Sequence, residues 1–419
     1  MKRWIIAIII GLPLTVWAGN RTYDPQVKTL EAVVNGNWLS PVTIMRLGSD
    51  DVLNIGFDEL SHDYHRYTYR LERCEADWKP AKDVFDSDWL EGFNGLPIDN
   101  YERSKNTTVL YTHYSLQIPN DQVQLKMSGN YRIHITDEDT DKEVAMVELL
   151  VTEASMTLAL EATTNTDIDT NGTHQQLSMS LNFGNCRVTK PEDQIKTVVM
   201  QNGRQDNWRR DTKPTARIVN GLEWKHQKDL IFDGGNEYRK FEVLDPSHPT
   251  MGIDYIFFVD QRYHVYPYVD EPRPNYLYDE DANGAFHVRN SDNRENETTC
   301  DYVYINFSLT TPERMGGDVI IDGAWTTEEP NTYIMEYDEG AEGYWKRILL
   351  KQGYYSYQYL FKPVIGKRSF LSTEGNFYQT ENTYQALVYY KGIDDRSWRL
   401  TAYSGIQLAS SDTHDRTLQ

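Results

Sequence analysis

The chain has 419 residues and a mass of 48.8 kDa, which predicts about three domains at roughly 150 residues each. Lys and Arg total 42 against 63 Asp and Glu, so the formal net charge is −21. This charge opposes non-specific attraction to nucleic acid and to anionic lipid, and a nucleic-acid-binding protein is therefore the first class set aside.

Aromatic residues favour a β-rich fold. The chain contains 29 Tyr, 13 Phe and 10 Trp, and such residues suit half-buried pleated surfaces better than helices. No segment shows apolar residues at helical spacing over three turns together with capping residues. Residues 83–91 are the only helix candidate, about one turn long. We expect an all-β protein of tandem immunoglobulin-like β-sandwich modules.

The first 18 residues have the pattern of a cleaved signal peptide. Lys2 and Arg3 precede an apolar run over residues 4–14, and residues 16–18 (VWA) suit signal peptidase. The run is shorter than the roughly 20 apolar residues that span a bilayer, so cleavage is favoured over an uncleaved anchor. The mature chain is then exported, with a net charge of −23 because Lys2 and Arg3 are lost from the −21 of the whole chain.

Three cysteines follow, Cys74, Cys186 and Cys300. They cannot all pair within one chain, and their spacing fits neither a disulfide scaffold nor a zinc site. Isolated buried thiols are favoured, with one long-range bridge left open.

Period-two alternation predicts strands in the first part of the chain. Residues 66–72 alternate strictly, and residues 131–135 and 145–151 do so on either side of the acidic turn 137–141. Residues 131–135 and 145–151, with the turn between them, are therefore predicted to form a hairpin. We place an N-terminal β domain at residues 19–152.

Two further domains are expected. A central β domain spans residues 153–310, with strands over 177–183, 255–259 and 303–309 and a hinge at 310–312. A C-terminal sandwich spans residues 311–410, and a polar tail covers 411–419.

The C-terminal segment is similar to immunoglobulin-like glycogen-binding modules, because a strand runs into residues 322–325 (DGAW) and a Tyr-rich strand follows at 353–359. This leaves an alternative function open, an exported carbohydrate-binding protein or glycosidase, in which Trp325, Tyr355 and Tyr357 stack on a sugar. Core packing is the favoured interpretation of this Tyr-rich strand.

No common catalytic signature is present: the chain lacks a phosphate-binding Gly-rich loop, a Gly-x-Ser-x-Gly elbow, a His-Glu-x-x-His sequence and paired-cysteine metal motifs. Asp137, Asp139, Asp141 and Glu148 superficially follow a calcium-loop spacing, but Lys142 stands where that loop needs Gly. His62 and His65 fit a surface loop better than a metal site. We expect no enzymatic activity, cofactor or metal.

Four long segments resemble one family: residues 41–60 (PVTIMRLGSDDVLNIGFDEL), 67–78 (YTYRLERCEADW), 88–120 (DWLEGFNGLPIDNYERSKNTTVLYTHYSLQIPN) and 128–133 (SGNYRI). It is the plug protein family of the type IX secretion system, and residues 374–392 match its C-terminal part. Arg73 departs from the pattern, in which His tends to precede the Cys. The residues that carry the resemblance are Arg46, Gly48, Cys74, Asp77, Trp78, Gly92, Tyr101, Ser104, Tyr111, Thr112, Tyr114, Pro119, Asn120, Gly129, Tyr131, Glu381, Asn382 and Tyr384.

The resemblance implies a periplasmic protein at the inner face of the outer membrane, which seals the giant translocon barrel when no substrate is being exported. Reversible sealing favours a polar, wet interface. Candidate translocon contacts are the turn 137–141, with Asp137, Asp139 and Asp141, and the Tyr-rich stretch 263–281, with Tyr276 and Tyr278. A third hypothesis, an adhesin or surface scaffold, differs from the plug by its exposure outside the cell.

Overall fold

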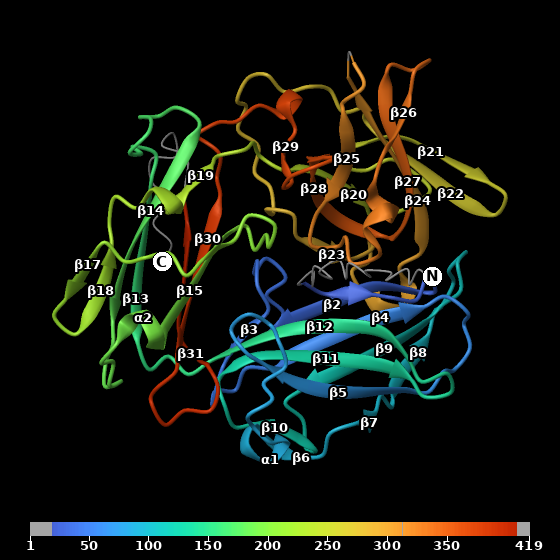
Figure 1. Cartoon of the computed structure of the whole chain (residues 1–419). Coiled ribbons are helices and arrows are strands. Elements are labelled where there is room, and N and C mark those ends of the chain that lie inside the picture. Colours follow the sequence, from blue (N-terminus) through green and yellow to red (C-terminus); the bar gives the residue numbers. More distant parts are fainter. Residues whose placement is uncertain (1–18, 312, 409–419) are drawn as a thin grey trace, which may run out of the picture.

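Strands dominate the computed structural model, which describes residues 19–311 and 313–408, and the predicted all-β class is confirmed. The strands form three β-sandwich modules, each with two main sheets. In Figure 1 the first module lies at the bottom, the second at the left and the third at the upper right. The predicted signal peptide and the predicted polar tail lie outside the described residues.

The first module pairs β1-β12-β11-β5-β7, with β3 parallel to β12, in one sheet and β2-β4-β9-β8 in the other, while β10 and β6 form a short ribbon. Its elements are β1 (Arg21–Thr22), β2 (Val27–Val34), β3 (Ile44–Arg46), β4 (Leu53–Glu59), β5 (Tyr67–Cys74), α1 (Asp86–Trp89), β6 (Leu90–Gly92), β7 (Leu96–Pro97), β8 (Asn100–Arg103), β9 (Thr112–Ile118), β10 (Val123–Leu125), β11 (Gly129–Asp137) and β12 (Lys142–Thr152).

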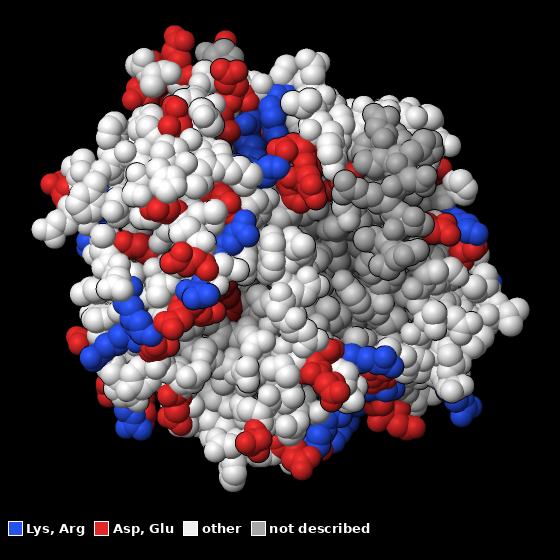
Figure 2. Space-filling view, turned by 180° about the vertical axis from the view of Figure 1, so that it is seen from behind, with Lys and Arg blue, Asp and Glu red and all other residues white. Residues whose placement is uncertain are grey.

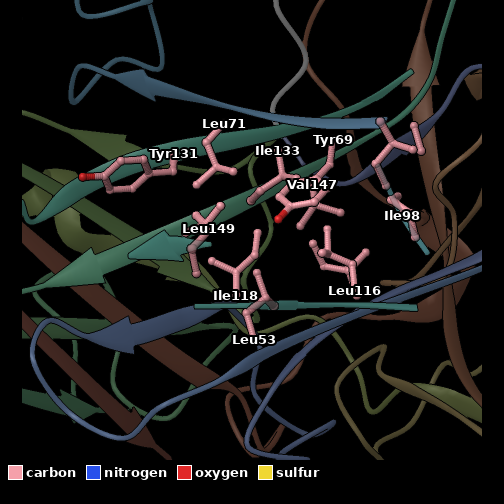
Figure 3. Packing of buried hydrophobic residues seen from close by; sticks show 14 of the residues in the cluster. Leu53, Tyr69, Leu71, Ile98, Leu116, Ile118, Tyr131, Ile133, Val147 and Leu149 are labelled. Carbon is pink, nitrogen blue, oxygen red and sulfur yellow. The ribbon is translucent and has the colours of Figure 1, made fainter. Parts of the chain in front are cut away.

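Alternation explains the core of this module. Tyr69, Leu71 and Ile133 point inward from one sheet and meet Leu53 and Ile118 of the other (Figure 3). The predicted hairpin is confirmed, because β11 and β12 pair from Gly129↔Val151 to Asp137↔Lys142 around the acidic turn. The single predicted helical turn is α1.

The second module is discontinuous in sequence. One sheet is β13-β14-β18-β17, with β19 beside β14, and the other is β16-β15-β30-β31. Its elements are β13 (Thr157–Thr163), β14 (His174–Asn182), α2 (Pro191–Gln194), β15 (Ile195–Gln201), β16 (Arg209–Arg210), β17 (Ala216–Ile218), β18 (Gly221–Trp224), η1 (Lys228–Leu230), β19 (Ile231–Asp233), β30 (Thr383–Tyr390) and β31 (Arg399–Gln407).

The third module lies between β19 and β30 in the chain. One sheet centres on β28, which pairs with β20, β23, β25 and β29, and the other is β21-β22-β24-β27-β26. Its elements are β20 (Arg239–Val243), β21 (Ile253–Val259), β22 (Arg262–Pro267), β23 (Phe286–Val288), α3 (Asn296–Thr299), β24 (Tyr302–Thr310), β25 (Gly317–Asp322), η2 (Pro330–Tyr333), β26 (Glu336–Asp338), β27 (Gly343–Lys351), β28 (Gly353–Pro363), β29 (Ser369–Phe370) and η3 (Ser372–Glu374).

Strand pairing groups the residues differently from the expected domains. The expected boundary after residue 310 follows β24 directly, yet β24 pairs with β27 on the other side of that boundary. The last two strands, β30 and β31, leave the third module and complete the second, where β15 pairs with β30 from Ile195↔Tyr390 to Gln201↔Tyr384. Strands that follow each other are the usual partners, so period two alone gives no sign of this insertion.

Candidate functional site

Two motif residues lie where the first module meets the second. Cys74 and Trp78 are buried in one hydrophobic cluster with Val198, Leu387 and Leu400 of the second module. Asp77, between them, is exposed and pairs with Lys79. The motif around Cys74 therefore builds a contact between modules.

Arg73 is the centre of the same interface. Its guanidinium is 3% exposed and donates to Ser397 Oγ at 2.8 Å and to the Trp398 carbonyl at 2.9 Å, both in the second module. It also donates to the Ser128 carbonyl at 2.8 Å and to the Tyr131 hydroxyl at 3.2 Å within the first. One side chain thus satisfies acceptors on both modules.

The first and third modules share a buried ion pair. Lys351 Nζ, at the end of β27, lies 2.6 Å from Asp58 Oδ2 on β4, and both side chains are at most 1% exposed. Asp58 also accepts from Tyr302 Oη at 2.7 Å and lies 2.7 Å from His113 Nδ1. Burial alone would raise the pKa of Asp58, yet Lys351 and His113 hold it below its ordinary value.

Motif residues surround this ion pair. The ring of Tyr111 lies 4.2 Å from Lys351 Nζ, and its hydroxyl donates to the Cys300 carbonyl at 2.7 Å. Ser104 Oγ accepts a hydrogen bond from the Tyr111 backbone N–H, which fixes the backbone directly before β9, where this ring is attached. The Asp301 carboxylate accepts backbone N–H groups of residues 108 and 109 at 2.8 and 3.0 Å. The interface combines charge, hydrogen bonds and a cation–π contact.

The other motif residues of the first module hold turns and core contacts. Gly48, Gly92 and Gly129 have positive φ, and a Cβ on Gly129 would lie 2.5 Å from Arg73 Nη1. Tyr131 packs beside Arg73, and Tyr114 Oη bonds to the backbone of residue 65. The remaining positions are Arg46 beside the turn after β3, exposed Tyr101, buried Thr112, cis Pro119 and Asn120, which donates to Tyr69 Oη.

The tail motif completes the second module. Tyr384 Oη and Asn382 Nδ2 both donate to Gln175 Oε1 on β14, at 2.5 and 2.9 Å. Asn382 also donates to the Gly234 carbonyl at 2.7 Å. The backbone N–H of Glu381 donates to Glu237 at 3.2 Å. These contacts fasten the returning strand β30 to its sandwich.

A cavity of about 720 Å³ lies where the three modules meet. Its wall includes Trp38 and Glu148 of the first module, Arg204 of the second and Asp322 of the third. Arg204 pairs with Asp206 through two contacts, 3.1 Å and 2.7 Å long. Burial raises the pKa of Asp322, although Arg204 nearby lowers it. Arg204 and Asp206 in the wall are thus paired with each other.

Metal-ligating residues are not grouped in the part of the chain that the structure describes: no cluster of three or more His, Cys, Asp or Glu could hold an ion there. Within residues 19–311 and 313–408 no helix has the length and apolarity to cross a membrane. All three cysteines are unpaired; Cys74 and Cys300 are buried, and Cys186 is half-buried.

The expected contact residues lie on two separate surfaces. Asp139 and Asp141 are exposed at the tip of the β11–β12 hairpin, whereas Asp137 is turned inward and accepts from the backbone and hydroxyl of Thr140. Tyr276 is half-buried and donates to Glu237 at 2.6 Å, while Tyr278 is 44% exposed. The two sets do not form one site.

The hairpin of β21 and β22 carries an exposed aromatic surface. The alternation pattern of the sequence does not predict this exposure. A continuous apolar run usually marks a buried strand, yet Phe257 and Phe258 are each 56% exposed and Val259 is 51% exposed. Tyr255 stacks on Tyr266 at 4.4 Å. The hairpin extends from the third module at the right of Figure 1, and β21 is the edge of its sheet.

Charge is distributed unevenly over the opposite face of the molecule. Figure 2 shows acidic and basic side chains interspersed at the left and around the rim, whereas uncharged residues dominate the centre. Where the described residues are visible on this face, charges of both signs are mixed, unlike the basic surface of a nucleic-acid-binding protein.

Three β-sandwich modules joined by buried polar contacts define a large all-β protein with extensive fixed interfaces. A family model described as type 9 secretion system plug protein 1st domain matches residues 27–153. A solved structure, of a hypothetical protein from Parabacteroides merdae ATCC 43184, is 35% identical, with a TM-score of 0.89, and the match covers 93% of this chain and 99% of that chain. The chain belongs to the type 9 secretion system plug protein family.

Two further solved structures are too dissimilar to indicate a shared fold. The C-terminal domain of the Streptococcus pyogenes antigen I/II-family protein AspA is 7% identical, with a TM-score of 0.14 over 93% of this chain and 98% of that one. Dimeric latent PorU from Porphyromonas gingivalis is 8% identical, with a TM-score of 0.15 over 92% of this chain and 34% of that one. No curated protein matches the chain.

We predict that Lys351→Met destabilises the chain by about 3–5 kcal/mol, because Asp58 would be left buried without its cation. Denaturant unfolding measures the loss. Lys79→Met is the matched control, since the Lys79–Asp77 pair is exposed and should contribute less than about 1 kcal/mol. Equal effects of the two substitutions would contradict this role of Lys351.

Glu237 gives a pH prediction. Burial raises its pKa to about 7 from an ordinary 4.5, although hydrogen bonds from Tyr276 and the Glu381 backbone favour the ionised form. Between pH 4.5 and about 7 the folded chain therefore binds more protons at Glu237 than the unfolded chain does. The contribution of Glu237 to stability consequently falls as the pH rises through this window. Its substitution by Gln, which cannot ionise, should remove that fall.

The measurement is the free energy of unfolding of wild type and Glu237→Gln from pH 4.5 to 8. Their difference should shift in favour of the variant by up to about 3 kcal/mol as the pH rises. Glu336→Gln, on the exposed edge strand β26, is the control and should show no such shift. Parallel curves for wild type and Glu237→Gln would refute the prediction.

Proposed function

We propose that this chain is a periplasmic stopper that binds the periplasmic mouth of the giant outer-membrane barrel of the type IX secretion system and seals it when no substrate is being exported. The family match over residues 27–153 carries this proposal. The protein would act by binding and by bulk, at the inner face of the outer membrane, with no enzymatic step.

The fixed interfaces suit such a role. A barrel wide enough for folded cargo leaks unless a body larger than a loop fills its opening. The Lys351–Asp58 pair and the Arg73 contacts hold three sandwiches together, so the whole chain can present one surface to the barrel. A loosely jointed chain of modules would seal less well.

The exposed β21–β22 hairpin supplies a contact for the barrel rim. Phe257 and Phe258 present an exposed aromatic surface that a partner protein can cover, and aromatic residues are frequent anchors at protein interfaces. The outer backbone edge of β21 also provides unpaired groups for an added strand. Asp139, Asp141 and Tyr278 stay proposed polar contacts at other points of the surface.

The sugar-binding alternative finds no support in the third module. Trp325, Tyr355 and Tyr357 are each at most 5% exposed and lie in one hydrophobic core cluster. Trp325 Nε1 donates to the Ser356 carbonyl, which uses its polar atom within the sandwich. These rings pack against one another and present no face on which a sugar could stack.

Copurification tests the function. Affinity isolation of the barrel from detergent-solubilised membranes, in cells blocked for cargo, should recover this chain in near-stoichiometric amount. Absence of the chain from every such preparation would refute the proposal.

We further predict that the double variant Phe257→Ser, Phe258→Ser lowers that recovery at least tenfold, because it removes the exposed aromatic contact and leaves the core intact. Val364→Ser, Ile365→Ser is the matched control: both residues are at least 87% exposed and lie away from the hairpin, so recovery should stay unchanged. Full recovery of the Phe257 and Phe258 variant would exclude the hairpin and leave the sealing function open.

A further inference from the structure

The backbone of Gly19 lies against a buried carboxylate. Its backbone nitrogen donates to Glu148 Oε2 at 2.8 Å, and Asn20 Oδ1 accepts from the Glu148 backbone at 3.0 Å. The Glu148 side chain is 7% exposed. The backbone at the half-buried residues Gly19 and Asn20 is therefore held against a buried carboxylate.

The charge on Glu148 is incompletely balanced. Arg132 Nη2 lies 3.4 Å from Glu148 Oε1, but in the sheet register Arg132 stands opposite both Glu148 and Glu72. Glu72 has a second basic partner, His134 Nε2 at 3.4 Å, whereas Arg132 makes only a long contact to Glu148. Burial raises the pKa of Glu148, although Arg132 and the hydrogen bond from Gly19 lower it. A second cation beside Glu148 would stabilise the ionised form.

Gln205 gives an independent indication of a missing donor. Its Nε2 donates to Glu148 Oε2 at 3.1 Å and lies 3.7 Å from where a Cβ on Gly19 would stand. Its Oε1, on the same amide group, is buried and has no hydrogen-bond partner within the described residues. A peptide N–H supplies one donor, whereas an ammonium supplies three, enough for both Glu148 and a second acceptor.

We propose that, once the predicted leader is removed by hydrolysis of the Ala18–Gly19 peptide bond, the new Gly19 α-ammonium forms an ion pair with the buried carboxylate of Glu148. Water supplies hydroxyl to the Ala18 carbonyl carbon as the C–N bond breaks. Gly19 nitrogen leaves as the amine and takes up protons, so the products are a carboxylate on the leader and an ammonium on the mature chain. The residues before the bond, Val16-Trp17-Ala18, suit a leader peptidase.

The new ion pair lies at the junction of all three modules. Gly19 and Glu148 line the central cavity, and Gln205 belongs to the second module. Immediately after Gly19, β1 pairs with β12, and the Thr22 backbone N–H donates to the Thr327 carbonyl of the third module at 2.9 Å. The new ion pair would therefore add a charged contact to the strand that touches every module.

The first test uses the natural protein. Mass spectrometry of the chain isolated from the cell envelope should give Gly19 as the first residue. Its α-amine should react with an acylating reagent at least tenfold more slowly in the folded chain than in urea, because the buried Glu148 carboxylate holds it protonated. A different first residue, or equal reactivity in both states, would overturn the proposal.

The second test compares a full mature chain that begins at Gly19 with one extended by Ser-Ala. The extension removes the ammonium at Gly19, so amide protection over residues 20–23 in hydrogen exchange should fall at least tenfold. In Glu148→Gln the same extension should change protection less than threefold, whereas Glu143→Gln, at an exposed site on the same strand, should behave as wild type. An extension effect of the same size in Glu148→Gln would refute the ion pair.

The acylation measurement needs no substitution, so it decides the proposal even if Glu148→Gln fails to fold. Neither test depends on the sealing function, because both follow the terminus of the chain and not its binding to a barrel.

Discussion

The buried pair between Lys351 and Asp58 constrains the architecture more than any other contact, because it removes two charges from water at the boundary of two modules. Such a pair is tolerated only when each charge meets its partner and its hydrogen bonds. Lys351 also donates to the Glu297 carbonyl at 2.6 Å, and Asp58 accepts from Tyr302. A shift of the third module relative to the first would leave both ions unsatisfied, so these two modules have one favourable arrangement.

The second module is held by different means with the same consequence. Arg73 reaches it from the first module, and Tyr389 Oη donates to Asn130 at 2.8 Å. Because the third module is inserted between β19 and β30, two chain connections join it to the second module. Chain topology and buried polar contacts thus act together to make three sandwiches one body, as a stopper requires.

Much of the fold could be predicted from the sequence. Alternation predicted three strands of the first module, β5, β11 and β12, and the acidic residues at 137–141 predicted the turn between β11 and β12. The insertion could not be predicted, because β15 and β30 are paired across nearly 200 residues and pairing at that separation leaves no local pattern.

The motif residues were recognised by resemblance, but alternation cannot show that Cys74 and Tyr111 serve interfaces between modules, since a buried residue looks alike in a core and at an interface. The exposure of the β21–β22 hairpin could not be predicted, because its apolar run resembles that of a buried core strand.

Outer-membrane permeability tests the central claim most directly. In cells that lack this chain but keep an intact translocon barrel, uptake of a large antibiotic normally excluded by the outer membrane should rise, and return of the wild-type chain should restore the barrier. If uptake stays at the wild-type level while the barrel is present and its opening is unblocked, the chain does not act as a seal.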